Sequence, residues 1–318
     1  MSYLLLVVGF VLLVKGADWF VAGTSSIAKA LRVPSIIIGL TIVAFGTSAP
    51  EAAVSITAAL KGSNDIALGN VIGSNIFNLL VVAGVSACLI PLTLNRSLLQ
   101  RDFPLSILAA AVLLLLAGLG GSLSRVDGLI LLAMFGWFLY STVSEALSSR
   151  ALTAQEAAAK GQEQEKEKEK SKTPAAILWA ILGLVCVIFG GDMVVDSAIA
   201  IARQFQVSEA LIGLTIVAIG TSLPELVTSL VAAKKGEPDI AMGNVIGSNI
   251  FNILGILGLS ATLHPIHTTG DTLIDTTVLI LVSLAAFLGT RKHRELRRPL
   301  GLSMAAVYAC YTIYLILR

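Results

Sequence analysis

Charged side chains are scarce in this chain, and their scarcity narrows the class of protein. Asp, Glu, Lys and Arg make up 13% of the 318 residues, whereas about 25% is usual in soluble domains. Hydrophobic residues make up 56%, and the mean hydropathy is +0.87. Apolar runs of roughly 20 residues, the length that crosses a bilayer, fill almost the whole chain. The composition therefore excludes a soluble domain and predicts an all-α polytopic membrane protein.

Cysteine and histidine are rare as well, with three residues of each. Cys88, Cys186 and Cys310 lie in or at the ends of apolar runs and lack the spacing of metal ligands. We interpret them as packing residues, because nothing indicates a disulfide framework. His264 and His267 stand at an expected outer helix end, where we expect surface or structural histidines.

The first apolar run lacks the basic segment and the small-residue cleavage site of a signal peptide, and it continues to Lys15 and Asp18. We therefore count it as the first of ten membrane-spanning helices. The expected spans are 3–28, 35–60, 66–90, 104–121, 126–147, 175–201, 209–233, 240–263, 273–289 and 299–317.

Lysine and arginine are distributed unevenly between the expected loops, and they gather in cytoplasmic loops of membrane proteins. With the N-terminus outside, the cytoplasmic loops hold 17 of these residues and the outside holds four, so we expect both termini outside. The 17 are Lys29, Arg32, Arg96, Arg101, Arg150, five linker lysines, Lys234, Lys235 and five residues from Arg291 to Arg298. The four are Lys61, Arg125, Arg203 and Arg318, and Lys15 lies within a span.

The chain contains a long internal repeat. Residues 39–78 recur without a gap at 213–252, 174 positions later: GLTIVAFGTSAPE becomes GLTIVAIGTSLPE, and GNVIGSNIFN returns unchanged. Five helices per half is an odd number, so the second half enters the membrane from the opposite side. Lys61 and its counterpart Lys235 should accordingly face opposite sides. An inverted-topology repeat is common in secondary transporters, whose substrate site lies near the midplane between the repeats.

The repeat also predicts the domain organisation. The first five-helix repeat covers 1–147 with its motif at 39–92, and the second covers 174–318 with its motif at 213–266. Between them, 148–173 contains QEQEKEKEKEKSK, which is typical of a solvated linker, helical or disordered. We expect this charged linker to be cytoplasmic, and it is too short for a folded domain.

Each copy of the repeat predicts a broken helix. Pro50 cannot donate a hydrogen bond to the carbonyl group of Gly46, and Pro224 stands in the same relation to Gly220. The carbonyl groups that are left without intrahelical partners are tolerated in a membrane only where they line a cavity or find other ligands.

Polar side chains surround both breaks. Thr47 and Ser48 share a helical face with Glu51. A second stripe, spaced i, i+4, i+8, consists of Asn70, Ser74 and Asn78, and the second copy supplies Thr221, Ser222, Glu225, Asn244, Ser248 and Asn252. Hard cations such as Ca²⁺ and Na⁺ prefer oxygen ligands of these kinds, and the absence of His and Cys argues against zinc or copper.

The two glutamates are costly in a membrane, at about 2.5–3.5 kcal/mol or more for each charge at a helix centre. One Ca²⁺, two Na⁺ or two protons would neutralise the pair formed by Glu51 and Glu225. An unloaded, ionised site is therefore unfavourable when it is closed off from water, which is a reason for obligatory exchange. The alternative is a polar network that only holds helices together.

Three further residue sets have simpler interpretations. We expect close helix packing at Gly69, Gly73, Gly243 and Gly247. Asp18 and Asp192 are repeat-related, and we expect a local ion pair between Lys15 and Asp18. An accessory role of both aspartates in the ion path is the alternative.

The duplicated motifs resemble the two α-repeats of the Ca²⁺/cation antiporter superfamily, and most of all its prokaryotic Na⁺/Ca²⁺ exchanger branch. The residues that carry this resemblance are GTSAPE and GTSLPE, each followed by GNVIGSNIFN. The resemblance implies a ten-helix inverted-repeat fold whose second, third, seventh and eighth helices are broken around the ions. It also implies that the first and sixth helices slide to switch access.

The same resemblance implies a set of ion ligands. Glu51 and Glu225 would coordinate Ca²⁺ with the carbonyl oxygens of Thr47 and Thr221. The Na⁺ ligands would be Ser48, Ser74, Ser222, Ser248, the carbonyl oxygens of Ala44 and Ala218, Asn78, Asn252 and both glutamates. Some members carry aspartate where this chain has Asn252, and in the K⁺-dependent branch that aspartate is tied to potassium. Asn252 therefore argues against K⁺ dependence.

The expected function is antiport that extrudes Ca²⁺ as Na⁺ enters, in the cytoplasmic membrane of a prokaryotic cell. The alternatives are H⁺/Ca²⁺ or other divalent cation antiport on the same fold, and a passive cation channel. An intramembrane enzyme would need unequal acid and base environments, so we expect none. The expected partners are the lipid bilayer and the transported cations, with no cofactor, nucleic acid or obligate protein partner indicated.

Overall fold

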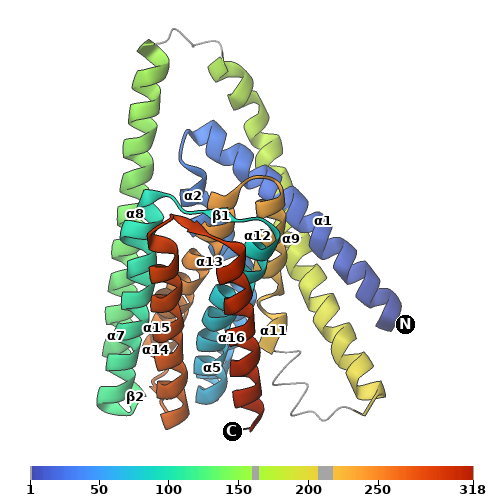
Figure 1. Ribbon diagram of the computed structural model, residues 1–318, viewed down its shortest axis with the longest axis vertical. Coiled ribbons are helices and arrows are strands. Elements are labelled where there is room, and N and C mark those ends of the chain that lie inside the picture. Colours follow the sequence, from blue (N-terminus) through green and yellow to red (C-terminus); the bar gives the residue numbers. More distant parts are fainter. Residues whose placement is uncertain (1, 160–164, 207–217, 318) are drawn as a thin grey trace.

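The computed structural model describes residues 2–159, 165–206 and 218–317, which are almost entirely helical (Figure 1). Segments labelled η are π-helical. The first half contains α1 (Ser2–Leu31), α2 (Ser35–Ile38), η1 (Gly39–Val43), α3 (Ala44–Thr47), α4 (Ala49–Leu60), α5 (Asn64–Phe77), η2 (Asn78–Ala83), α6 (Gly84–Leu89), β1 (Leu92–Thr93), η3 (Leu98–Asp102), α7 (Phe103–Gly120), β2 (Ser122–Leu123) and α8 (Arg125–Ala159). The second half contains α9 (Glu165–Gln204), α11 (Ala218–Gly220), α12 (Leu223–Lys234), α13 (Pro238–Ile250), η5 (Phe251–Leu257), α14 (Gly258–Leu263), β3 (Ile266–His267), α15 (Gly270–Arg291), β4 (Glu295–Leu296) and α16 (Arg298–Leu317).

Eight described helices are long and apolar enough to cross a membrane. A ninth span consists of two helical pieces, Ser35–Thr47 and Ala49–Leu60, which meet at an angle of 52°. The remaining predicted span, 209–233, begins outside the described residues, and its described part is α11 and α12. Large apolar side chains such as Leu119 (78% exposed) and Phe189 (62% exposed) cover the outer helix faces, as expected for contact with lipid. The chain is therefore a multi-pass membrane protein.

The repeat is visible in the element boundaries. The bounds of α4, 49–60, return unchanged 174 positions later as those of α12, and η2 and η5 follow their preceding helices in the same way. Two short antiparallel strand pairs then join the halves. In one pair, β1 and β4 bring Leu92 opposite Leu296; in the other, β2 and β3 bring Leu123 opposite Ile266. Each pair thus consists of one strand from the first half and one strand from the second half.

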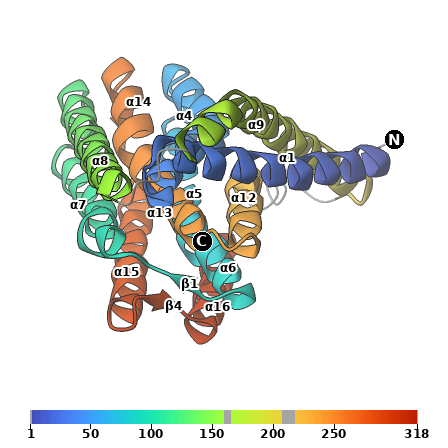
Figure 2. The same cartoon turned by 90° about the horizontal axis from the view of Figure 1, so that it is seen from above.

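Helices α1 and α9 form a closely packed pair that extends away from α7, α8 and α15 (Figure 2). A Cβ atom added at Gly16 would lie 2.8 Å from the carbonyl oxygen of Gly183, and one added at Gly190 would lie 2.6 Å from the backbone nitrogen of Leu13. These distances are shorter than any normal Cβ contact, so the two backbones touch. Glycine at these positions is what permits the approach.

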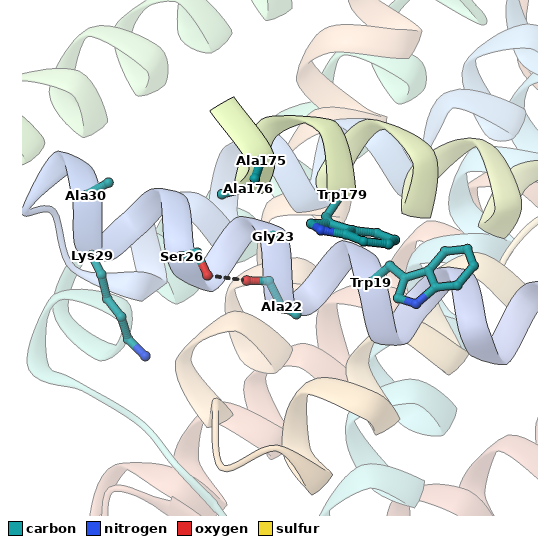
Figure 3. Close-up of a pocket in the computed structure, with 9 residues that line it drawn as sticks. All are labelled: Trp19, Ala22, Gly23, Ser26, Lys29, Ala30, Ala175, Ala176 and Trp179. Carbon is teal, nitrogen blue, oxygen red and sulfur yellow. Dashed lines mark hydrogen bonds between the residues drawn. The ribbon is translucent and has the colours of Figure 1, made fainter. Parts of the chain in front are cut away.

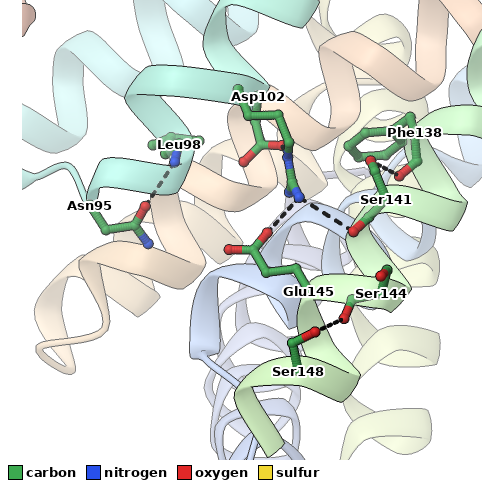
Figure 4. Close-up of polar contacts among 9 residues, drawn as sticks. Asn95, Leu98, Asp102, Phe138, Ser141, Ser144, Glu145 and Ser148 are labelled. Carbon is green, nitrogen blue, oxygen red and sulfur yellow. Dashed lines mark hydrogen bonds and ion pairs between the residues drawn. The ribbon is translucent and has the colours of Figure 1, made fainter. Parts of the chain in front are cut away.

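The two longest described helices, α8 and α9, include most of the predicted charged linker, 148–173. Helix α8 continues to Ala159 and α9 begins at Glu165, so the described parts of 148–173 are helical, and both helix ends project beyond the rest of the bundle (Figure 1). A partly buried ionic cluster joins α8 to η3 (Figure 4). Arg101 contacts Asp102 at 2.7 Å and Glu145 at 2.5 Å. Arg101, which we expected in a cytoplasmic loop, is therefore bound to two carboxylates at the start of a span.

Candidate functional site

Both predicted helix breaks are present. Helix α3 ends at Thr47 and α4 begins at Ala49, with Ser48 between them at φ −83° and ψ 10°. Ser222 has nearly the same conformation between α11 and α12, at φ −91° and ψ 6°. Pro50 and Pro224 stand in the first turn of the helix that follows each break, where a missing N–H group costs nothing. The chain therefore places a serine at the tip of each break.

The third and eighth helices are not broken, and the expectation that they would be is wrong for the described structure. Asn64–Leu89 and Pro238–Leu263 each run as one apolar helix. Neither contains proline beyond its first residue, so nothing removes a backbone donor from the interior. Each instead contains a π-helical segment, Asn78–Ala83 or Phe251–Leu257, which widens one turn without breaking the helix.

Glu51 of the first half receives a hydrogen bond from the second half. Its side chain is completely buried, and Ser222 Oγ donates to Glu51 Oε1 at 3.0 Å. Ser74 Oγ lies 3.4 Å from the same oxygen and also receives a bond from Ser222 Oγ at 3.1 Å. The carboxylate therefore binds the serine at the break of the opposite repeat.

Glu225 repeats this arrangement from the other side. It is also completely buried, and Ser48 Oγ donates to Glu225 Oε1 at 2.8 Å. Ser248 Oγ lies 3.5 Å from that oxygen. The structure thus brings together both predicted glutamates and the four predicted serines around a pseudo-two-fold centre.

Asparagine and threonine side chains surround this centre. Asn70 Nδ2 donates to Ser55 Oγ at 2.8 Å and to the Glu51 carbonyl oxygen at 3.3 Å, while Thr221 Oγ1 donates to Asn70 Oδ1 at 3.4 Å. The equivalent bonds of the second copy join Asn244 to Ser229 Oγ at 3.0 Å, to the Glu225 carbonyl oxygen at 3.4 Å and to Thr47 Oγ1 at 3.0 Å. Both predicted threonines therefore bond to the asparagine of the opposite repeat.

Two asparagines at the centre were missed by the sequence reasoning. Asn75 Nδ2 donates to the Asn249 carbonyl oxygen at 3.1 Å, and Asn249 Nδ2 donates to the Asn75 carbonyl oxygen at 3.2 Å. Asn252 Nδ2 donates to Asn75 Oδ1 at 3.0 Å, and Asn78 Nδ2 donates to Asn249 Oδ1 at 3.4 Å. The signal was available, because both missed residues lie in the duplicated GNVIGSNIFN, one position after the serine of the polar stripe.

The two glutamates and the Ser, Thr and Asn side chains bonded around them form one hydrogen-bond network, called the glutamate lattice below. Four buried oxygen atoms of this lattice have no hydrogen-bond partner among the described residues. They are Oε2 of Glu51 and Glu225 and Oδ1 of Asn78 and Asn252. Buried acceptors without partners are rare in folded proteins and often mark the place of an ion. The free acceptors come in repeat-related pairs, so each half contributes equally to a cluster of oxygen atoms suited to a hard cation.

Of the two alanine carbonyl oxygens predicted as Na⁺ ligands, that of Ala44 lies at the hydrogen-bond network. The Ala44 carbonyl oxygen lies 3.4 Å from Ser248 Oγ and 3.3 Å from Thr47 Oγ1, so it faces the lattice. Ala218 is the first residue of α11, and its environment lies outside the described side chains.

Comparison with known proteins agrees with this geometry. The model of the sodium/calcium exchanger protein family matches residues 1–143 and 175–317. This chain belongs to that family. The sodium/calcium exchanger MaX1 of Methanosarcina acetivorans is 33% identical over 343 residues, covering 99% of this chain and 98% of its own length. The inner membrane protein YrbG of Escherichia coli K12 is 38% identical over 309 residues, covering 93% and 91%.

A solved structure confirms the expected fold. The sodium-calcium exchanger NCX_Mj, soaked with 2.5 mM Na⁺ and 0.1 mM Ca²⁺, matches with a TM-score of 0.83 at 31% sequence identity. The match covers 97% of this chain and 96% of that chain. The predicted family and the predicted two-repeat helical membrane fold are therefore confirmed.

The glycines of the second copy pack as expected. A Cβ atom at Gly247 would lie 2.7 Å from Leu40 Cα, and one at Gly243 would lie 2.9 Å from Gly39 Cα. No described atom lies within 4 Å of a Cβ added at Gly69 or Gly73. Their repeat-related contacts would come from around residue 213, which lies outside the described residues.

The predicted ion pair between Lys15 and Asp18 is wrong. Asp18 Oδ1 instead contacts Lys235 Nζ at 2.9 Å, and the same ammonium group donates to the Asp18 carbonyl oxygen at 2.7 Å. Lys235 reaches Asp18 because it follows the last residue of α12, and α1 packs against α12. Asp192 is exposed on α9 and forms no ion pair with a described residue. Neither aspartate reaches the glutamate lattice in this structure.

A separate cavity of about 540 Å³ lies beside the α1–α9 pair and not at the glutamates (Figure 3). Trp19 and Trp179 line it with ring centroids 5.4 Å apart, and Lys29 also lines it.

The predicted surface histidines His264 and His267 are both exposed, and His267 lies in β3 opposite Ser122 of β2. Among the described residues no group of three His, Cys, Asp or Glu side chains is placed to hold a metal ion.

Proposed function

We propose that this protein is a secondary antiporter that exchanges Na⁺ for Ca²⁺ by alternating access. The observation that carries the proposal is the pair of buried glutamates, each bonded to the serine of the opposite repeat and each with one oxygen that has no hydrogen-bond partner among the described residues. Two such carboxylates bring two negative charges into the membrane interior, and a divalent cation compensates both at once.

The proposed ligands follow the lattice. Ca²⁺ would be held by Glu51 and Glu225 with the carbonyl oxygens of Thr47 and Thr221. Na⁺ would occupy positions that use the serine hydroxyls and the unpartnered amide oxygens. These ligands are Ser48, Ser74, Ser222, Ser248, Asn78, Asn252, both glutamates and the carbonyl oxygens of Ala44 and Ala218.

Obligatory exchange follows from charge. When the ions leave, four serine hydroxyls remain near the glutamate oxygens, and two carboxylate oxygens have no hydrogen-bond partner in the part of the chain that the structure describes. Closing this empty, ionised site away from water is unfavourable, whereas closing it around Ca²⁺ or Na⁺ is not. The transporter therefore changes sides when it is loaded and rarely when it is empty.

The direction of transport rests on the loop charges. We place both termini outside the cytoplasmic membrane of a prokaryotic cell, where an inward Na⁺ gradient would drive Ca²⁺ out. The lipid bilayer and the transported ions are then the partners, and no resident cofactor is needed.

The test is uptake of radiolabelled Ca²⁺ into proteoliposomes that contain the purified protein. Internal Na⁺ with Na⁺-free medium outside should drive uptake, and dissipating the Na⁺ gradient should stop it. Uptake that responds only to a pH gradient would replace Na⁺ by H⁺ as the coupling ion and keep the glutamates as carriers. Ca²⁺ flux that continues without any ion on the opposite side would indicate a channel and contradict exchange.

A further inference from the structure

The two halves differ in how the α1–α9 pair contacts them. Helix α1 packs along α12, where Leu13 and Ala17 contact Val227 and Val231. The repeat-related contact would be between α9 and α4, and the described parts of these helices make no comparable contact. The α1–α9 pair therefore packs mainly against α12 of the second repeat, although the two repeats have matching sequences at the glutamate site.

An ion pair fastens this arrangement. The turn after α12 places Lys235 against Asp18 of α1, with the ammonium group 2.9 Å from the carboxylate and 2.7 Å from the backbone oxygen. In the same turn Glu237 Oε1 accepts a hydrogen bond from Ser25 Oγ at 2.5 Å. These contacts join the first half to the second at one end of the bundle.

The same residues exist in the other half, but they are apart. Asp192 and Lys61 stand 174 positions from Asp18 and Lys235. The turn after α4 has the same shape as the turn after α12: Lys61 has φ −88° and ψ 0° where Lys235 has φ −81° and ψ 0°. Both lysines precede a glycine with φ near +74°, at Gly62 and Gly236. Yet neither Lys61 nor Asp192 forms an ion pair with any described residue.

We propose that Asp18–Lys235 and Asp192–Lys61 are alternative latches that hold the α1–α9 pair in its two access states. The inverted repeat requires this exchange: in the opposite state α9 packs on α4 as α1 now packs on α12, which brings Asp192 to Lys61. Each latch is released as the other forms. The proposal rests on the proposed antiport function, and it assigns the four residues to positioning the helix pair and not to binding ions.

The position of the latches suits this role. Lys235 is 31% exposed and Asp18 is 48% exposed, so the pair is formed in contact with water and its net strength is small, a factor of about two to five. A weak latch biases the two states without locking either one. In the orientation that the loop charges favour, the latch formed here closes the cytoplasmic side.

Paired cysteines test the proposal directly, because each latch joins one half of the chain to the other. In a C88A/C186A/C310A background, one variant carries D18C/K235C and a second carries D192C/K61C. A protease site inserted in the linker separates the halves on a gel unless a bismaleimide reagent has joined them. Both pairs should cross-link, and either cross-link should block Na⁺-driven Ca²⁺ uptake.

Neutral variants test whether the latches alternate. D18N or K235Q should raise the cross-linking rate of the D192C/K61C pair about two- to five-fold, whereas D18E, K235R and the charge-swapped D18K/K235D should leave it near the starting rate. K234Q is the matched control, because the adjacent Lys234 is exposed and forms no ion pair with a described residue.

A D192C/K61C pair that never cross-links, or one whose rate is unchanged or lowered by D18N, would overturn the latches. The cross-linking rates need no ion gradient, so they decide the proposal even if Na⁺ fails to drive Ca²⁺ uptake. Conversely, normal Na⁺-driven uptake without alternation would remove the latches and leave the exchanger.

Discussion

The contacts between the two repeats are symmetric in the glutamate lattice and asymmetric at the flanking α1–α9 pair, called the flank below. In the lattice, the serine bonds to the two glutamates match between the repeats: Ser48 binds Glu225 as Ser222 binds Glu51. At the flank the symmetry is lost, because α1 packs on α12 and Lys235 binds Asp18, whereas Lys61 forms no ion pair with a described residue. The ion site is therefore equivalent towards the two sides of the membrane. In the latch proposal, the contacts of the α1–α9 pair determine which side of the membrane is closed off from the site.

This difference separates two tasks that a transporter must perform. An ion site that served one side better than the other would trap its cargo in one state. A flank that was equally packed in both directions would leave both sides equally open or closed. Changes at the centre should accordingly affect both repeats alike, and changes at the flank should shift the protein towards one state.

The largest effect is expected from removing a charge at the centre. Glu51→Gln and Glu225→Gln should each reduce Na⁺-driven Ca²⁺ uptake to the level of protein-free vesicles, because one carboxylate cannot compensate a divalent cation. The two variants should be equally inactive in radiolabelled Ca²⁺ uptake. Wild-type rates in either one would mean that the two halves are not equivalent and that the site is assigned wrongly.

A smaller loss is expected from the serines at the helix breaks. Ser48→Ala and Ser222→Ala each remove a hydrogen bond to a charged group, worth about 1.5–3 kcal/mol. Because both serines are proposed Na⁺ ligands, that energy corresponds to roughly a 10- to 150-fold loss in Na⁺ affinity. The Na⁺ concentration that gives half-maximal exchange should rise by the same factor in both variants. Ser303→Ala removes an exposed hydroxyl that bonds only to the Leu300 carbonyl oxygen, and it should change nothing.

The sequence predicted the centre better than the flank, for a physical reason. Polar residues in an apolar span are conspicuous, so Glu51, Glu225 and their serines were recognisable from one sequence, and Pro50 and Pro224 revealed the breaks. Asn75 and Asn249 were overlooked because they stand one residue away from the stripe that helical periodicity defines. The bond between Asp18 and Lys235 was not predictable, since it depends on which repeat the α1–α9 pair leans against.

A moderate loss of stability is expected from the reciprocal asparagines. Asn75→Ala and Asn249→Ala each remove interhelical amide bonds, which contribute about 0.6–2 kcal/mol apiece in membrane proteins. Both variants should unfold at a lower temperature in detergent, by equal amounts. The double variant should lose less than the sum, because the two side chains bond to each other's backbone and share one network. Unequal single losses would contradict the symmetry of the centre.

The smallest effect, and the sharpest test of the flank, concerns Ser25. Its bond to Glu237 has no counterpart, because the repeat-related residues are Ile199 and Ser63, and an isoleucine side chain cannot donate a hydrogen bond. The sequence itself therefore favours the state in which α1 packs on α12. Ser25→Ala should weaken that preference by a factor of about two to five, seen as slower D18C/K235C and faster D192C/K61C cross-linking. If both rates change in the same direction, the bond stabilises the fold in general and does not select a state. Opposite changes would show that one hydroxyl, absent from the other repeat, sets the resting side of an otherwise symmetric exchanger.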